Sequence, residues 1–299
     1  MFLVFTPFTY LFLLFYFVVL FCIFSISNFY VFWLYIEVLI LLYIGISYTL
    51  FCNSYTQLML YFLVQTVASF SLLVFFRINY YFLFCMFLFL KLGMFPFFSW
   101  YIAVLYRFPS FVLAFRSTIH KLPPLLLLGI VLESSIVPVV VVSGFLSLLV
   151  GGFLMLTVYD FRYLLIVSSI ANNFFLILGA ISEHYVRFSA FFILYTFTIF
   201  ALLASIRGFL KPLLIHEYFK ISFLFFVGCL LFNIASLPPF PMFFVKFFLI
   251  YDFLSCYATF TGLVIFSVLV NVSIAVSYCQ LVIKYFSQAY SSSFSFFLY

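Results

Sequence analysis

The sequence predicts an all-α membrane protein: a single polytopic domain over residues 1–299 with about ten transmembrane helices. The chain is 69% hydrophobic and only 6% charged, whereas soluble domains carry about 25% charged residues. Its apolar runs are continuous rather than alternating, which favours helices over a β-barrel. At about 20 residues per span, the length allows ten or eleven helices joined by short loops.

Polar and turn-forming residues divide the apolar runs in chain order. The separators are Ser25–Asn28, Cys52–Ser54, Arg77–Asn79, Arg107–Ser110, Asp160–Arg162, Glu183–Arg187 and Arg207–Lys220. The expected helices therefore cover residues 2–24, 29–51, 56–76, 80–106, 110–130, 136–158, 163–181, 188–206, 221–251 and 257–283. The Ser-rich tail, 287–299, is too short to span a membrane.

Two of the expected helices carry a break beside a lysine. Lys91 precedes Gly93 and Pro96 in the first half, and Lys246 follows the run 237–241 with its three prolines in the second half. Paired, Pro-interrupted segments are typical of transporters built from inverted repeats. We therefore expect a first repeat over about 1–131 and a second over about 136–283.

Four ionisable residues lie well inside expected spans: Glu37, Lys91, Lys121 and Lys246. A lysine at the bilayer centre costs about 2.5–3.5 kcal/mol on insertion scales. Burial favours the neutral form of a lysine, and a nearby carboxylate restores the charged form. The four residues are thus candidates for a proton relay with bridging waters.

Other interpretations of these charges remain open. A lysine within about two turns of a helix end can extend to the headgroups, most readily Lys246. Glu37 can be a neutral acid in contact with a neighbouring helix. Arg116 lies nearer a span end, so we expect it to extend to the headgroups. His120 projects about 100° away from Lys121 on a helix, which favours a helix–helix hydrogen bond over a relay role.

The remaining polar residues favour structural roles. We expect hydrogen bonds between helices from the cluster Ser168, Ser169, Asn172 and Asn173. The other acidic residues are expected in loops or at the membrane interface, and they are Glu133, Asp160, Glu183, Glu217 and Asp252.

Cofactor and nucleic-acid functions are disfavoured. The six cysteines are scattered without a CxxC motif, which argues against iron–sulfur ligation and a disulfide framework. Three histidines are too few to hold two haems by paired imidazoles. The net charge of +6 forms no polybasic run, so nucleic acid is not an expected partner. We therefore predict no cofactor and no metal.

The two Asp residues lie far apart, which also disfavours a lipid-modifying enzyme with an Asp-rich metal motif.

Six segments, in order along the chain, resemble subunit 2 of NADH dehydrogenase in respiratory complex I. They include Trp33 to Glu37, Lys91-Leu92-Gly93-Met94-Phe95-Pro96 and His120-Lys121-Leu122-Pro123-Pro124. The full set covers residues 33–37, 61–69, 91–100, 120–124, 163–171 and 237–246. The chain departs from the family at Leu60, Phe97-Phe98 and Asn172, where the family has Lys, Phe-His and His.

The resemblance implies an antiporter-like, proton-pumping subunit with inverted repeats and broken helices. It implies that Glu37 is the acidic partner of Lys91, that Lys121 is the central lysine, and that Lys246 is the terminal lysine of the half-channel. The related subunit 4 has Glu at the last position, so Lys246 favours subunit 2. Its partners are then other membrane-arm subunits of complex I, lipids, protons and internal water.

We therefore predict a proton-translocating subunit of NADH:ubiquinone reductase, without a redox centre of its own, that moves protons as quinone is reduced elsewhere in the complex. The family and the Phe-rich composition, typical of an AT-rich organellar genome, predict an organelle-encoded protein of the mitochondrial inner membrane. The alternatives are a stand-alone cation/proton antiporter subunit and a structural membrane scaffold.

Overall fold

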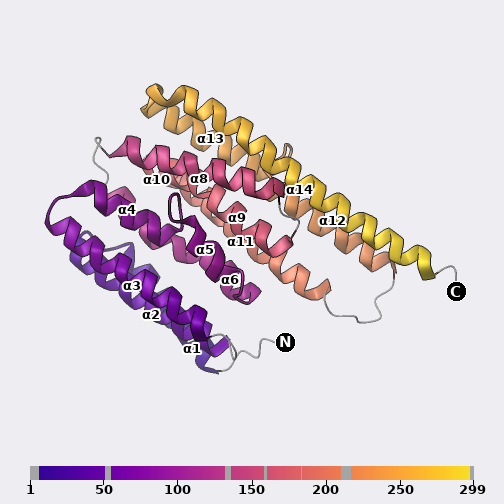
Figure 1. Ribbon diagram of the computed structural model, residues 1–299, viewed down its shortest axis with the longest axis horizontal. Helices are drawn as coiled ribbons and strands as arrows, with labels where there is room; N and C mark the ends of the chain where they lie inside the picture. Colours follow the sequence, from indigo (N-terminus) through magenta and orange to yellow (C-terminus); the bar gives the residue numbers. More distant parts are fainter. Residues whose placement is uncertain are drawn as a thin grey trace. The chain divides into compact units, whose positions relative to one another are not determined.

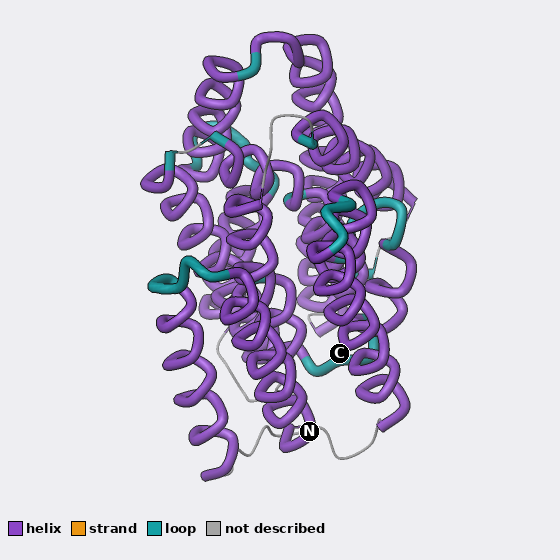
Figure 2. The backbone as a smooth tube through the Cα atoms, turned by 90° about the vertical axis from the view of Figure 1, so that its left-hand side faces the viewer, coloured by secondary structure: helices purple, strands orange, loops and turns teal. Residues whose placement is uncertain are grey.

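The computed structural model describes residues 7–50, 55–131, 136–157, 160–182, 184–209 and 217–296, with side chains except at 206–224 and 285–296. Every regular element of this part of the chain is a helix (Figure 2), which confirms the predicted all-α fold. Seven of the described helices are long and apolar enough to cross a membrane. Three shorter apolar helices, Pro7–Ile23, Tyr81–Leu92 and Phe225–Ile234, fall within expected spans, so the predicted number of about ten differs from the number of full-length spans.

The chain forms two compact units, residues 1–147 and 148–299, and the boundary lies within helix α8 (Val137–Thr157). The first unit contains α1 (Pro7–Ile23), α2 (Phe29–Leu50), α3 (Tyr55–Arg77), α4 (Tyr81–Leu92), α5 (Phe98–Leu105), α6 (Ser110–Ser117), η1 (Ile119–Lys121) and α7 (Leu122–Val131). The second contains α9 (Phe161–Ala171), α10 (Asn173–Ile181), α11 (Tyr185–Phe209), α12 (Glu217–Ile234), α13 (Pro241–Cys256), η2 (Ala258–Phe260) and α14 (Thr261–Phe296).

In the first unit, α1 packs on α2, α2 on α3, and α3 on α4 (Figure 1). Helix α7 contacts both α2 and α4. The interrupted segment Ser110–Val131, which joins α6, η1 and α7, is 83% buried. It therefore forms the interior of this unit, and the side chains that it carries are removed from lipid.

In the second unit, α10 packs against α9, α11 and α13, and α12 packs against α11, α13 and α14. The segment Phe161–Ile181 is 94% buried, so it is the interior helix of this unit. A one-residue interruption at Asn172 divides it into α9 and α10.

The predicted helix over 80–106 is interrupted where Gly93 was expected to loosen it. Gly93 has φ +68°, and its amide donates to the Leu90 carbonyl while the Met94 amide donates to the Phe89 carbonyl. This pair of bonds is the Schellman arrangement, which ends a helix with a left-handed residue. A Cβ on Gly93 would lie 2.4 Å from the ring of Tyr101, so this close approach requires glycine.

The second predicted break has the same hydrogen bonds. Ser236, at φ 57°, donates from its amide to the Asn233 carbonyl, and the Leu237 amide donates to the Phe232 carbonyl. Helix α12 ends there, and α13 begins at Pro241, where proline is tolerated because the first helical amides have no partner in the helix. Both lysine-bearing breaks are therefore built in the same way, one in each unit.

One boundary was predicted wrongly. The expected end of the last helix, near residue 283, is replaced by a helix, α14, that continues to Phe296. The apolar pattern stops near Lys284, but Ser, Gln and Ala do not break a helix as Gly and Pro do, so the helix extends beyond its apolar part.

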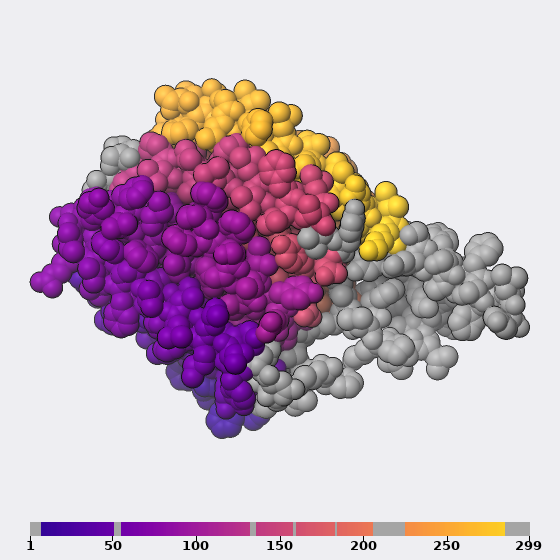
Figure 3. Space-filling model, viewed as in Figure 1, coloured from indigo at the N-terminus to yellow at the C-terminus, as the bar shows by residue number. Residues whose placement is uncertain are grey.

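The helices expose many large apolar side chains, as a lipid-facing surface requires. Phe8, Phe21, Leu63, Phe197 and Ile265 are each more than half exposed. Side chains of the N-terminal helices make up the indigo and purple surface in the space-filling view (Figure 3). Polar side chains are instead concentrated among the buried residues described below.

Candidate functional site

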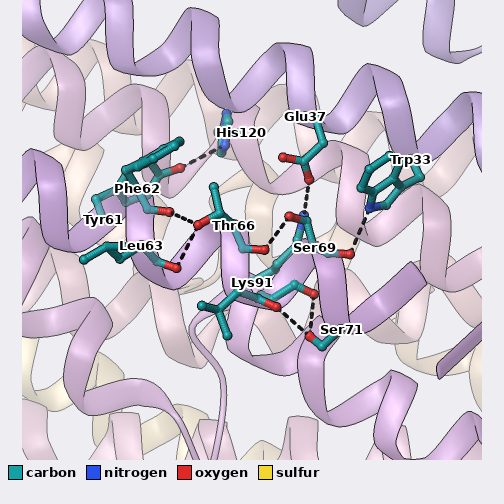
Figure 4. Close-up of polar contacts among 12 residues, drawn as sticks. Trp33, Glu37, Tyr61, Phe62, Leu63, Thr66, Ser69, Ser71, Lys91 and His120 are labelled. Atoms are coloured by element: carbon teal, nitrogen blue, oxygen red, sulfur yellow. Dashed lines mark hydrogen bonds and ion pairs between the residues drawn. The ribbon is translucent and has the colours of Figure 1, made fainter. Parts of the chain in front are cut away.

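Glu37 and Lys91 form an ion pair inside the first unit, as predicted. Glu37 Oε1 on α2 lies 3.9 Å from Lys91 Nζ on α4, and Figure 4 shows the two side chains directed toward each other. The Lys91 side chain is 2% exposed and that of Glu37 is 20% exposed. Neither atom has a hydrogen-bond partner, so the contact is electrostatic and leaves both groups able to bind another polar group.

Arg116 lies beside this pair and not at the headgroups, so the prediction that it extends to the interface was wrong. Its side chain is 1% exposed, and its Nη2 donates a 2.7 Å hydrogen bond to the carbonyl oxygen of Lys91. Its guanidinium lies 5.2 Å from the ring centre of Tyr61 and 5.9 Å from that of Tyr101. The physical reason is the orphan carbonyl where α4 ends, which offers a buried acceptor to a cation.

His120 is held between two tyrosines from different helices. The Tyr16 hydroxyl on α1 lies 2.8 Å from Nδ1, and the Tyr61 hydroxyl on α3 lies 3.0 Å from Nε2. Figure 4 shows the contact between Tyr61 and His120. This confirms the expected hydrogen bonds between helices. A neutral imidazole needs one donor and one acceptor, and tyrosine hydroxyls can serve as either.

Lys121 follows His120 in η1 and is fully buried, with its Nζ 5.3 Å from the ring centre of Tyr101. A lysine in this position does not extend to the headgroups. The Tyr101 ring lies close to both Arg116 and Lys121. Nothing in the sequence marks Tyr101, because a tyrosine in an apolar run carries no signal until its neighbours are known.

A small cavity connects the polar side chains of the first unit. Gln65, Lys91, Arg116 and His120 line it together with apolar residues and the two prolines that open α7. The volume of this cavity that the centre of a water molecule can occupy is about 10 Å³. This value is close to the minimum that one water needs. Nitrogen atoms of Gln65, Lys91 and Arg116 lack partners. One water bound here would therefore satisfy several buried groups at once.

Lys246 is the corresponding lysine of the second unit. It lies in α13, is 3% exposed, and its Nζ donates to Asn271 Oδ1 at 3.4 Å. The same Nζ lies 4.4 Å from the ring centre of Phe175. Burial rules out the alternative in which Lys246 extends to the headgroups. No carboxylate within the described residues forms an ion pair with Lys246, so it differs from Lys91.

Asp252 was expected in a loop or at the membrane interface, and it lies near the end of α13 with its side chain buried by partners from α11 and the turn before it. Its side chain is 3% exposed and forms an ion pair with Arg187, with His184 Nε2 3.9 Å from the same carboxylate oxygen. The reason is that Asp252 lies near the end of α13, where it faces the start of α11. Asp160 is exposed, as expected. The structure describes neither Glu133 nor Glu183, and it does not describe the side chain of Glu217.

The serine and asparagine cluster of α9 and α10 is buried. The hydroxyls of Ser168 and Ser169 donate to carbonyls of their own helix, those of Leu165 and Ile166. Among the described residues no group of three His, Cys, Asp or Glu is placed to hold a metal ion.

A protein of known structure has a fold similar to that of this chain. No family model matches the sequence, and no curated protein matches it. A chain in the structure of respiratory complex I from Thermus thermophilus with bound aureothin has a similar fold, with a TM-score of 0.70 and 18% sequence identity. The match covers 84% of this chain and 64% of that chain. The protein therefore shares its all-α membrane fold with a chain of respiratory complex I and spans less than two thirds of that chain's length.

Proposed function

We propose that the protein is an antiporter-like, proton-translocating membrane subunit of respiratory complex I, of the subunit 2 type. In this proposal it resides in the mitochondrial inner membrane, contacts other membrane-arm subunits and lipids, and moves protons while quinone is reduced elsewhere in the complex. It contributes to NADH:ubiquinone reductase without holding a redox centre itself.

The Glu37–Lys91 pair carries the proposal. An ionisable residue inside a membrane is costly and marks ion or proton pathways more often than structure. Here an acid and a base meet at 3.9 Å beside a helix break. Irregular backbone in a membrane is tolerated where protein or water surrounds it. The pair can thus bind and release a proton as its separation changes, because a closer carboxylate stabilises the charged lysine.

Lys121 and Lys246 extend the relay within their own units. Each is buried, and each lies beside an aromatic ring that stabilises a cation. Asn271 gives Lys246 a neutral partner, which stabilises the ammonium less than a carboxylate does. A lysine whose described polar partner is a neutral amide exchanges its proton more easily than one paired with a carboxylate, so Lys246 suits transient protonation. The finer assignment to subunit 2 depends on lysine, and not glutamate, at position 246.

A structural scaffold is the competing function, and one observation favours it for part of the chain. The Arg187–Asp252 pair joins α11 to α13 near their ends, as a purely structural contact would. A stand-alone cation/proton antiporter would share the same buried lysines but would act without a redox assembly.

The test replaces Lys121 with Met in the intact complex and measures protons moved per NADH oxidised in closed membrane vesicles. We expect translocation to fall severalfold while a native gel shows normal assembly, because Met retains the packing of the side chain and removes the proton. Lys284→Met is the matched control, since this lysine is exposed at the end of the apolar part of α14. Normal assembly and unchanged translocation in Lys121→Met would instead favour the scaffold.

A further inference from the structure

Among the described residues of the first unit, buried cations outnumber carboxylates. Residues 1–147 contain two acidic residues, Glu37 and Glu133, and the structure describes only Glu37. Three buried cations, Lys91, Arg116 and Lys121, share this unit. Among the described residues, the one carboxylate of this unit pairs with Lys91, and Arg116 adds a second positive charge beside that pair in a medium where charge is expensive.

Arg116 differs from the lysines because it keeps its charge. A guanidinium does not lose its proton under physiological conditions, whereas a buried lysine does so readily. Its position is also fixed: Nη2 is bonded to the Lys91 carbonyl at 2.7 Å, and two tyrosine rings flank the guanidinium. The positive charge of Arg116 is thus held permanently against the backbone of the lysine that pairs with Glu37.

We propose that Arg116 is a positioning residue whose fixed charge offsets the Glu37 carboxylate, so that the proton on Lys91 becomes transferable. With Lys91 protonated, the Glu37, Lys91 and Arg116 group carries one positive charge in excess. With Lys91 neutral, the group is balanced. Without Arg116 the balanced state would be the closed Glu37–Lys91 ion pair, in which the lysine retains its proton. This inference rests on the proposed function and deepens it.

The geometry gives the released proton a first acceptor. Lys91, Arg116 and His120 line the same water-sized cavity, and Lys91 and Arg116 each carry a buried nitrogen that lacks a hydrogen-bond partner. A water molecule in the cavity takes the proton from the Lys91 ammonium and leaves a neutral amine. Both ring nitrogens of His120 are bonded to tyrosine hydroxyls. A proton therefore enters the imidazole at one nitrogen only as another leaves at the opposite nitrogen, and each tyrosine hydroxyl gives up its own proton as it takes one up, so that all three groups stay neutral.

The test is the pH dependence of proton translocation, because a merely structural residue would not move it. The groups that interact with the charge of the guanidinium set this profile, and they are Tyr16, Tyr43, Tyr61, Lys91, Tyr101, His120 and Lys121. Glu37 acts on it through its ion pair with Lys91. Lys91 is the group that the proposal concerns, because its backbone carbonyl accepts the hydrogen bond from Arg116 while its amine pairs with Glu37.

In vesicles with the intact complex, Arg116→Gln should move the midpoint of the translocation profile to higher pH by about one unit, the size of shift that a nearby charge produces. The midpoint moves upward because, without Arg116, no other cation offsets the Glu37 carboxylate, which then stabilises the protonated form of Lys91. Arg116→Lys keeps the charge and should keep the parent profile. Arg107→Gln, at an exposed arginine, is the matched control and should also leave the profile unchanged.

Glu37→Gln provides the opposite test. It removes the described carboxylate and leaves Arg116 unbalanced, so the midpoint should move to lower pH. The double variant Arg116→Gln/Glu37→Gln removes both fixed charges and should return the midpoint toward the parent value. If Arg116→Gln fails to assemble, Glu37→Gln and the double variant decide: a downward shift and its reversal support the proposal, and any other pattern overturns it.

Failure of this inference differs from failure of the proposed function. An Arg116→Gln profile equal to that of Arg107→Gln, with translocation still lost in Lys121→Met, overturns the role of Arg116 alone. Unchanged translocation in Lys121→Met, Arg116→Gln and Glu37→Gln together overturns proton transfer through this chain.

Discussion

At the residue scale, the structure separates two kinds of buried charge. Lys91 and Lys246 have weak or distant polar partners, whereas Asp252 is held by Arg187 and lies near His184. Replacing Arg187 with Gln should lower stability by about 1–3 kcal/mol, because it leaves a buried carboxylate without its main partner. Asp252→Asn should cost less, since it removes the charge itself. Thermal unfolding in detergent measures both.

The double variant Arg187→Gln/Asp252→Asn should be more stable than Arg187→Gln alone, because no unpaired charge remains. Arg162→Gln, at an exposed arginine, is the control for loss of a guanidinium. Equal losses for Arg187→Gln and Arg162→Gln would show that the pair contributes nothing to stability.

At the element scale, the break between α4 and α5 depends on one glycine. Gly93 combines a left-handed backbone with a close approach of the Tyr101 ring. Gly93→Ala should destabilise the protein by about 2 kcal/mol or more, from left-handed strain plus overpacking. The measurement is the unfolding temperature together with the amount of assembled protein. Gly262→Ala is the matched control, because a Cβ there would meet no atom within 4 Å; equal effects of the two changes would contradict this role of Gly93.

At the scale of the whole molecule, the outward-facing phenylalanines form an apolar surface without individual roles. Phe197, in the middle of α11, is 66% exposed. Phe197→Leu should leave membrane insertion unchanged, since Leu is as lipid-soluble as Phe. Phe197→Lys should cost about 2.5–3.5 kcal/mol and reduce the share of the chain recovered in the membrane. Equal recovery of both variants would show that this face does not contact lipid.

The sequence predicts the fold and the burial of the lysines because hydropathy and helix-breaking residues are local properties. Gly93 and the prolines at 238–241 mark both breaks before any contact is known. The position of Arg116 and the burial of Asp252 could not be predicted in this way, because each depends on a partner that is distant in sequence. The partner of Arg116 is the Lys91 carbonyl, and the partner of Asp252 is Arg187. The division into repeats, and any path between the two units, stay predictions.

The indole of Trp33 has a consequence for optical measurements. The chain has only two tryptophans, and Trp33 lies one helical turn before Glu37 with its Nε1 bonded to the Ser69 carbonyl at 2.8 Å (Figure 4). Indole emission is sensitive to nearby charge and hydration. In a Trp100→Phe background, the indole fluorescence of the isolated chain, excited at a wavelength that tyrosine does not absorb, therefore arises from a single site four residues from the carboxylate. A change in the charge of the Glu37–Lys91 pair can therefore be followed as a shift in the emission wavelength of Trp33, without an added label.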